Sequence, residues 1–213
     1  FINEVANLCE KTGVNIEDVS IGMGLDKRIG SRFLRAGPAY GGSCFPKDTR
    51  AIIETSKKFN TNLSIIKSVV NSNRNRSKLL LDRVSFLLKN KIKNKKICFL
   101  GVTFKANTDD MRESSSLKMI PYLAKKGAII KYYDPTGIKK EFNKLKNVKY
   151  CTDLKDACNN SDLLIIHTEW NEFKQLNFKK LVNKRNFKIY DLRNLYSPNT
   201  MKKNKINYFC IGM

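Results

Sequence analysis

Apolar residues recur at helical spacing through the first part of the chain. Residues 2–13 follow the i, i+3, i+4, i+7 pattern of an amphipathic helix, which Gly13 ends. A short helix is expected after Asn15, a further one from Pro46 to about residue 59, and one long helix or two end to end over 63–89. The first ninety residues therefore predict a region that is nearly all helical.

The pattern changes after a lysine-rich polar stretch at residues 90–96, where we place a domain boundary. Short runs of β-branched and aromatic residues follow, as expected of strands buried on both faces. These runs lie at 96–101, 128–134, 148–151, 162–168, 187–191 and 206–211, with helical stretches between them at 113–126, 137–145, 152–159 and 176–184. Alternating strands and helices predict a parallel, doubly wound sheet, so the chain belongs to the α/β class with an all-helical domain (1–90) before a sheet domain (91–213).

Composition supports a globular protein. The chain has 213 residues, of which 41% are hydrophobic and 28% charged, and no apolar run is long enough to span a membrane. It starts at Phe1 without a methionine or a signal peptide, so we expect a piece of a longer, cytoplasmic protein. The six cysteines form no CxxC pair, which argues against a disulfide framework and against a metal site.

The net charge of +22 raises the question of a polyanionic partner. The basic residues are spread over the whole length, and no stripe of aromatic residues accompanies them. This distribution favours a solvated, lysine-rich surface, and the sequence predicts neither a nucleic acid nor a membrane as a partner. The alternative, a basic nucleic-acid-binding protein, would show steeply salt-dependent binding.

The stretch GPAYGGSCFPKDT, residues 37–49, is the first candidate for chemistry. Its glycines allow close approach of the backbone to a ligand, and Cys44 lies just before a helix expected to start near Pro46. The positive end of that helix and the cation of Lys47 both favour a thiolate, and Asp48 could orient a water or move a proton. The alternative is a buried, inert cysteine in a tight loop.

A second candidate is GVTFKANTDDMRESSS, residues 101–116, which follows the first strand of the sheet. Ligands bind beyond the carboxyl ends of parallel strands, so Lys105 and Arg112 could hold phosphates there. Glu113 and the serines at 114–116 are expected to cap the next helix. This stretch is not the G-x-G-x-x-G dinucleotide motif, and a charged surface turn is the alternative.

Two single residues end buried strands of the predicted sheet. His167 is the sole histidine, and we expect a satisfied histidine at a strand end there, not a catalytic group. Arg193, in the stretch DLRN, follows another strand at the presumed ligand edge. An arginine at that edge gains weight only together with the other candidates.

Together these stretches resemble the UDP-glucose 6-dehydrogenase family, within the wider group of UDP-sugar and GDP-mannose dehydrogenases. The resemblance covers essentially the whole chain and keeps the family's motif order. The matching stretches are FINEVANLCE, GMGLDKRIGSRFLRAG, YGGSCFPKD, FKANTDDMRESSS, YYDP, HTEW and DLRN. It implies a helical central domain followed by a Rossmann-like, nucleotide-sugar-binding domain, and a homodimer or higher homo-oligomer.

The resemblance also implies a reaction. A sugar alcohol is oxidised in two steps to a carboxylate while two NAD molecules are reduced, with UDP-glucose as the substrate. Cys44 matches the nucleophile that forms a thiohemiacetal and then a thioester, and Asp48 matches an aspartate that assists proton transfer or hydrolysis. Lys47 and Arg112 match residues on the NAD side.

The substrate residues implied by the resemblance come from three stretches. Arg28 matches an arginine that family members present to the neighbouring subunit's substrate. The others that match are Arg35, Ala36, Gly37, Pro38, Ala39, Tyr40 and Gly41 along the sugar nucleotide, and Phe104, Lys105 and Arg193 at its uracil, ribose and phosphate end.

Two departures from the family pattern keep alternatives open. Ala39 stands where the UDP-glucose enzymes usually carry glycine, so a dehydrogenase for GDP-mannose or a UDP-hexosamine remains an alternative. The family's NAD-binding domain, with its G-x-G-x-x-G turn and its catalytic lysine and asparagine, is expected upstream of Phe1. Alone, the chain would be an inactive fragment or a UDP-sugar-binding and dimerisation module.

Overall fold

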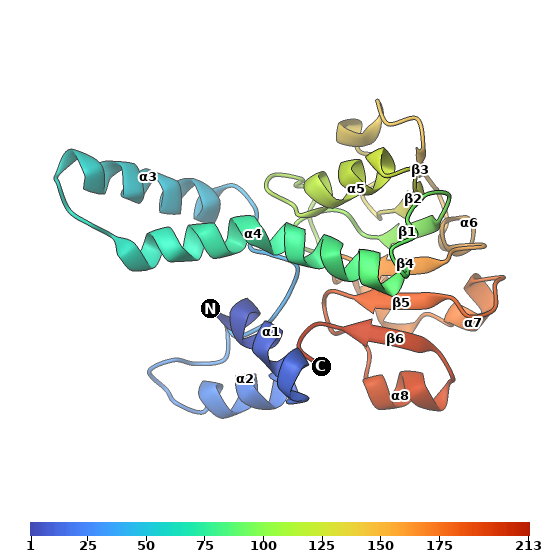
Figure 1. Cartoon of the computed structure of the whole chain (residues 1–213), viewed down its shortest axis with the longest axis horizontal. Helices are drawn as coiled ribbons and strands as arrows, with labels where there is room; N and C mark the ends of the chain where they lie inside the picture. The colour runs from blue at the N-terminus through green and yellow to red at the C-terminus, as the bar shows by residue number, and fades with distance from the viewer.

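The computed structural model describes all residues, 1–213. Four helices form the first part of the molecule: α1 (Ile2–Thr12), α2 (Ile16–Gly24), α3 (Cys44–Lys58) and α4 (Ser64–Leu87). As predicted, Gly13 ends α1 with a left-handed φ of 74°, and the Asn15 side chain caps α2 by accepting a hydrogen bond from the Glu17 N–H. The long apolar stretch folds as one helix, α4, which runs back along α3 toward the sheet (Figure 1).

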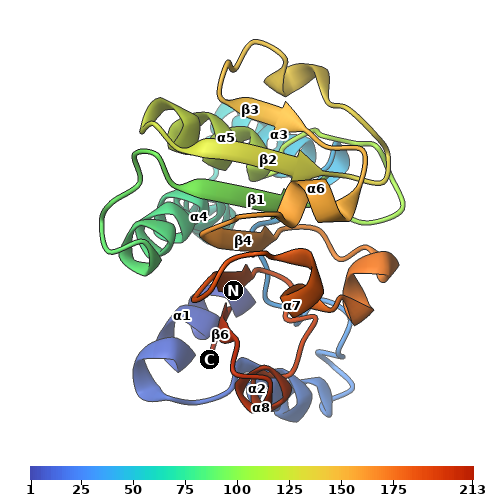
Figure 2. The same ribbon diagram turned by 90° about the vertical axis from the view of Figure 1, so that its right-hand side faces the viewer.

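The second part is a six-stranded, fully parallel sheet, as the sequence predicted. Its strands are β1 (Lys96–Leu100), β2 (Ile129–Tyr133), β3 (Val148–Tyr150), β4 (Leu163–Ile166), β5 (Lys188–Asp191) and β6 (Asn207–Cys210). They lie in the order β3-β2-β1-β4-β5-β6, which is the doubly wound arrangement (Figure 2). The order reverses between β1 and β4, and ligands of such sheets bind at that point, beyond the carboxyl ends of the strands.

The helices of the sheet part differ in three places from the predicted ones: two predicted helices are shorter, and a helix at Pro198–Lys203 lies where none was predicted. The chain forms α5 (Ser116–Lys125), α6 (Leu154–Cys158), α7 (Phe178–Leu181) and α8 (Pro198–Lys203), with 3₁₀ turns η1 (Lys140–Phe142) and η2 (Asn171–Gln175). The helix predicted at 137–145 is only the turn η1, and the one at 176–184 shrinks to α7. At η1 a single turn is enough to place the Phe142 ring against Tyr132, with ring centroids 5.4 Å apart.

Successive strand residues point to opposite faces of the sheet and into two separate hydrophobic clusters. Ile97 and Phe99 of β1 pack on the face covered by α4 and α5, while Cys98 and Leu100 pack on the face with α6 and α7. The first cluster continues without a break into α1 and α2. The helical part and one sheet face therefore share a single core. None of the helices combines the length and apolar character needed to cross a membrane.

Candidate functional site

Cys44 is the first residue of α3 and the one exposed cysteine of the six. The helix starts two residues earlier than predicted, so the thiol lies within its first turn instead of before it. Pro46 is accommodated there because the first backbone N–H groups of a helix have no partner inside the helix. The Cys44 thiol is thus accessible and lies where the helix dipole favours an anion.

The loop before Cys44 packs closely on the segment after β1. The Gly42 N–H donates a hydrogen bond of 2.8 Å to the carbonyl of Arg112, and Gly42 has a left-handed φ of 82°. A Cβ added to Gly41 would lie 2.7 Å from the carbonyl oxygen of Glu113, and one added to Gly42 would lie 2.9 Å from the Phe104 ring. The glycines are therefore required for this contact. They bring the two candidate motifs of the sequence together.

The same loop is held from its other side by the helical part. Asn73 on α4 accepts a hydrogen bond from the Tyr40 N–H and donates one to the Tyr40 carbonyl, both 3.0 Å long. Arg76, one turn further along α4, donates to the Gly37 carbonyl, and the Asn3 side chain of α1 accepts from the Gly37 N–H at 2.8 Å. Sequence analysis missed Asn73 and Arg76. Their signal is two polar residues at i and i+3 on a helix face that continues into buried leucines.

Arg193 fixes the segment after β1 from the sheet side. Its guanidinium donates hydrogen bonds of 2.8 Å to the carbonyls of His167 and Phe104, and its Nε lies 2.9 Å from a Glu169 oxygen without hydrogen-bond geometry. Burial lowers the pKa of Arg193. The Thr168 hydroxyl adds a bond of 2.7 Å to the Thr103 carbonyl. Two of the five N–H donors of Arg193 are therefore engaged by main-chain carbonyls, and its charge is paired with Glu169.

Ser115 occupies the N-cap position of α5 but makes no capping hydrogen bond, and Ser114 accepts only a long one of 3.4 Å from the Ser116 N–H, so the predicted capping is largely absent. Ser114 and Ser116 donate to the Val102 carbonyl, and the Ser115 hydroxyl lies 2.8 Å from Nε2 of His167. They bind back to the strand end because the loop folds over it, a contact that local sequence cannot reveal. His167 is fully buried and hydrogen-bonded, as predicted. Burial first, and Arg193 second, lower its pKa to about 3.

Three exposed cations surround the two motifs. Lys47 pairs with Asp48 at 3.5 Å, and the Lys105 ammonium lies 5.4 Å from the centre of the Phe104 ring. Arg112 forms a two-point ion pair with Asp110, a hydrogen-bonded contact that raises the pKa of Arg112. All three are exposed, and each keeps N–H donors that could bind phosphate groups.

The remaining predicted residues fall into two sets. Pro38 is buried, Ala36 packs on the large core, and the Tyr40 ring meets Phe45 edge-on at 4.7 Å. By contrast, Arg28 is exposed and bound only to Asp26, and Arg35 is exposed. Within one copy of the chain these two arginines are not brought to Cys44.

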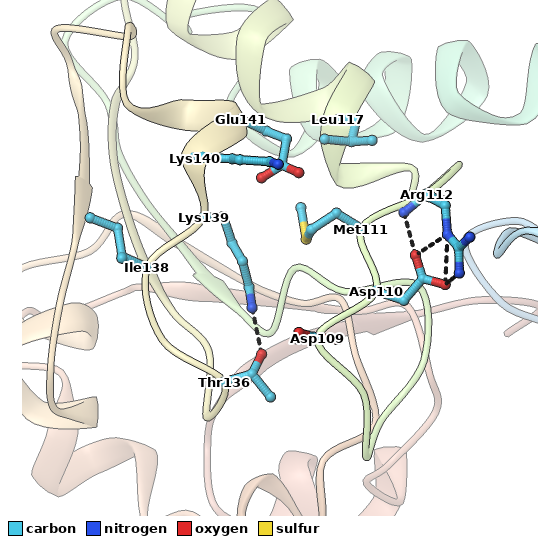
Figure 3. Close-up of a pocket in the computed structure, with 10 residues that line it drawn as sticks. All are labelled: Asp109, Asp110, Met111, Arg112, Leu117, Thr136, Ile138, Lys139, Lys140 and Glu141. Atoms are coloured by element: carbon cyan, nitrogen blue, oxygen red, sulfur yellow. Dashed lines mark hydrogen bonds and ion pairs between the residues drawn. The ribbon is translucent and has the colours of Figure 1, made fainter.

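Cavities border this region, and two of them exceed 200 Å³. The larger, of about 600 Å³, opens beyond the carboxyl ends of β1 and β2 (Figure 3). It is lined by Asp109, Asp110, Met111, Arg112, Leu117, Thr136, Ile138, Lys139, Lys140 and Glu141. A smaller one, of about 240 Å³, lies between α4 and the start of α5, and Ala39 lines it with Asn73 and Ser77. Ala39 thus contributes to a cavity that Phe104, Lys105 and Arg193 do not line.

Comparison with known proteins gives consistent matches along the chain. Residues 1–75 match the central domain of the UDP-glucose/GDP-mannose dehydrogenase family, and residues 98–198 match its UDP binding domain. The whole chain is 42% identical to proteins named UDP-glucose 6-dehydrogenase from Rickettsia felis and Rhizobium meliloti. It covers 48% and 49% of those proteins, so it spans about half the length of the curated relatives it matches. The solved UDP-glucose dehydrogenase of Pyrobaculum islandicum superposes with a TM-score of 0.84 at 30% identity, over 98% of this chain and 46% of that one.

Proposed function

Because this chain belongs to the UDP-glucose/GDP-mannose dehydrogenase family, we propose that it is the nucleophile-bearing and sugar-nucleotide-binding half of an NAD-dependent UDP-glucose 6-dehydrogenase. The reaction would oxidise UDP-glucose to UDP-glucuronate. The relatives with 42% identity over the full chain carry that name. The observation that supports the proposal most directly is the exposed Cys44 thiol at a helix N-terminus, held against the segment that carries Phe104, Lys105 and Arg112.

Cys44 would act after the first oxidation. Loss of a hydride and a proton converts the C6 alcohol to an aldehyde, and the Cys44 sulfur adds to its carbonyl to give a thiohemiacetal. Loss of a second hydride gives a thioester, which water hydrolyses to the carboxylate and the free thiol. Asp48, one turn into α3 and exposed, would take the proton from that water.

The sugar nucleotide would lie along the loop from Ala36 to Gly41 and reach the segment after β1. There, Lys105 supplies a cation and Phe104 a ring face for the uracil. Arg193 would act mainly through the backbone, because its guanidinium already holds the Phe104 carbonyl. Residues 1–90 would thus contribute the nucleophile and the loop along the sugar nucleotide, and residues 91–213 the contacts at its uracil end.

NAD would be held only in part by this chain. Gly101 ends β1 without further glycines, and the carboxylate of Asp134 at the end of β2 is occupied by the Val102 N–H and by Thr136. The sheet's own first turn therefore does not fit a dinucleotide. Exposed Lys47 and Arg112 fit a contact with cofactor phosphates from one side. When bound, NAD supplies the acceptor for the two hydrides.

A homodimer belongs to the same proposal. Arg28, which has no contact with Cys44 in its own copy, lies in a segment with large exposed apolar side chains, including Leu25 at 78% and Phe33 at 91% exposure. A partner copy would cover these side chains and bring Arg28 to a neighbouring site. The prediction is a dimer by light scattering that loses affinity when Phe33 becomes Ser.

Alkylation of Cys44 tests the proposal without requiring turnover. Cys44 is the one exposed cysteine, so iodoacetamide should label it alone in the folded protein, and UDP-glucose should slow the labelling. Labelling that millimolar UDP-glucose leaves unchanged would contradict the site. In the protein expressed with any coding sequence that precedes Phe1, Cys44→Ala should abolish UDP-glucuronate formation. Normal product formation by that variant would remove Cys44 from the mechanism.

A second candidate substrate is another nucleotide sugar, since Ala39 departs from the family pattern. Ala39 lines the smaller cavity beside Asn73 and Ser77, so its methyl group could alter which sugar the loop accepts. A parallel assay with UDP-glucose, GDP-mannose and UDP-N-acetylhexosamines decides between them.

A further inference from the structure

The backbone of the loop before Cys44 is fixed by two side chains of α4 that touch no reacting atom. We propose that Asn73 and Arg76 are positioning residues that set the placement of the Cys44 sulfur toward the substrate, a role that rests on the function proposed above. Both lie on the α4 face turned to residues 37–40. Their side chains contact the backbone of that loop, and neither forms a hydrogen bond with Cys44.

Asn73 holds Tyr40 by two opposed hydrogen bonds. Its amide oxygen accepts from the Tyr40 N–H and its amide nitrogen donates to the Tyr40 carbonyl, each at 3.0 Å. Such a closed pair fixes both the position and the orientation of the residue, because rotation breaks both bonds at once. Tyr40 is four residues before Cys44, and its ring also packs edge-on against Phe45.

Arg76 holds Gly37 and ties the loop to α1. It is 3% exposed, and its fork reaches three neutral acceptors and no carboxylate. Nε and Nη2 donate to the Gly37 carbonyl at 3.3 and 3.1 Å, and Nη1 donates to the Asn3 carbonyl at 3.2 Å and to the Asn7 side chain at 2.6 Å. Burial lowers the pKa of Arg76. A buried guanidinium that is not paired with a carboxylate adds little net stability. Its rigid, planar set of N–H donors can instead hold several acceptor groups in fixed positions at once.

The far end of the loop is fixed by the sheet part, through the hydrogen bond from Gly42 to the Arg112 carbonyl. The backbone is therefore held at residues 37, 40 and 42, and Cys44 follows within two residues. Removing one of the α4 contacts leaves the loop attached but free to shift. A misplacement of about 1 Å at a reacting group can lower a rate by about 100-fold.

This role predicts a defect that a loss of stability does not produce. The first hydride transfer does not need the Cys44 sulfur, whereas the second requires the sulfur adduct. A displaced thiol should therefore release the aldehyde before the second step. The ratio of NADH to UDP-glucuronate should then rise above the two expected for complete oxidation, and semicarbazide should trap the released aldehyde.

The test uses Asn73→Ala and Arg76→Lys, with Asn75→Ala and Arg74→Lys as controls. The control residues are exposed and lie on the same helix. The protein is expressed with any coding sequence that precedes Phe1 and assayed with NAD and UDP-glucose below the onset of thermal unfolding. We expect both test variants to form UDP-glucuronate at least about 10-fold more slowly and to release aldehyde, and both controls to behave as the parent. Asn73→Asp, which keeps the acceptor and loses the donor, replaces Asn73→Ala if the latter does not fold.

Test variants whose rates fall only in proportion to their unfolded fraction, with no released aldehyde, would overturn the inference. The inference would also be overturned if the control variants lose as much UDP-glucuronate-forming activity as the test variants. If the parent protein oxidises no nucleotide sugar, the proposed function is wrong, whatever the variants show. The positioning role is then read from the rate of Cys44 alkylation, which should change by about threefold or more in the test variants and not in the controls. An unchanged alkylation rate would reject it.

Discussion

The buried histidine makes stability depend on pH in a window that can be stated in advance. His167 is fully buried, and its ring nitrogens meet the hydroxyls of Ser115 and Thr168 at 2.8 and 3.1 Å. Arg193 donates to the carbonyl of the same residue. Protonation would place a second cation beside Arg193 inside the core, and burial together with that arginine lowers the pKa of His167 to about 3.

The direction in which stability changes with pH follows from which state, folded or unfolded, binds more protons. In the unfolded chain His167 titrates near pH 6.5, so between about pH 6.5 and pH 3 the unfolded state binds the extra proton. The stability contributed by the neutral ring is fully present above that window and is lost as the pH falls through it, by up to about 1.4 kcal/mol per pH unit. Between pH 7 and pH 4.5 the loss from this residue is about 2.5 kcal/mol.

Urea unfolding of the parent protein and of His167→Gln, followed at half-unit intervals from pH 4.5 to pH 7, measures this effect. Gln can keep a hydrogen bond to Ser115 but cannot take up a proton, so its stability curve should be flatter in this range even if its stability at pH 7 is lower. His167 is the only histidine, which makes the difference in slope specific to it. Parallel curves for the two proteins would refute the reasoning.

Three further outcomes test the loop and the core. Gly41→Ala should lower the rate of UDP-glucuronate formation by about 100-fold, because the added carbon would lie 2.7 Å from the Glu113 carbonyl oxygen and displace the loop. Steady-state kinetics measure this rate, and a normal rate would contradict the close contact. Gly212→Ala should destabilise the protein by about 2 kcal/mol more than Gly137→Ala in thermal unfolding, since both have positive φ but only the former would overlap a core side chain; equal losses would rule out the clash. Lys105→Gln should weaken UDP-glucose binding about 10-fold in calorimetry, and unchanged binding would exclude a phosphate contact.

The parts of the fold that sequence could predict are those set by local pattern. All six strands were predicted from short runs rich in β-branched and aromatic residues; β1 and β4 are buried on both faces, whereas β3 and β6 at the sheet edges are only partly buried. The ends of α1 and α2 were predicted from Gly13 and Asn15, whose backbone and side-chain preferences act within one turn. The helix expected at 137–145 failed because one turn already brings Phe142 to the core, and Leu145 packs on the same core from beyond that turn.

Sequence could predict the motifs of the candidate site but not the residues that hold those motifs in place. The glycines around Gly41 and the segment ending in Arg112 were singled out separately, yet their direct contact depends on the fold. Asn73 and Arg76 act on main-chain atoms more than thirty residues away in sequence; their spacing on one helix face is visible in the sequence, but the loop that they bind is not. Ser115 looks like a helix cap in sequence, but a tertiary contact with His167 takes its hydroxyl.

The hydrophobic core shared by α1, α2, α4 and one face of the sheet bears on how the molecule can move. Separating residues 1–90 from residues 91–213 would open that core to water, so heating should melt both in one cooperative transition despite the change of pattern at residue 90. For the same reason, a hinge motion between residues 1–90 and residues 91–213 cannot open the site for entry of a sugar nucleotide. Access of the sugar nucleotide to the site would then be controlled by movement of exposed side chains such as Lys47 and Lys105, or by another domain or subunit that closes over them.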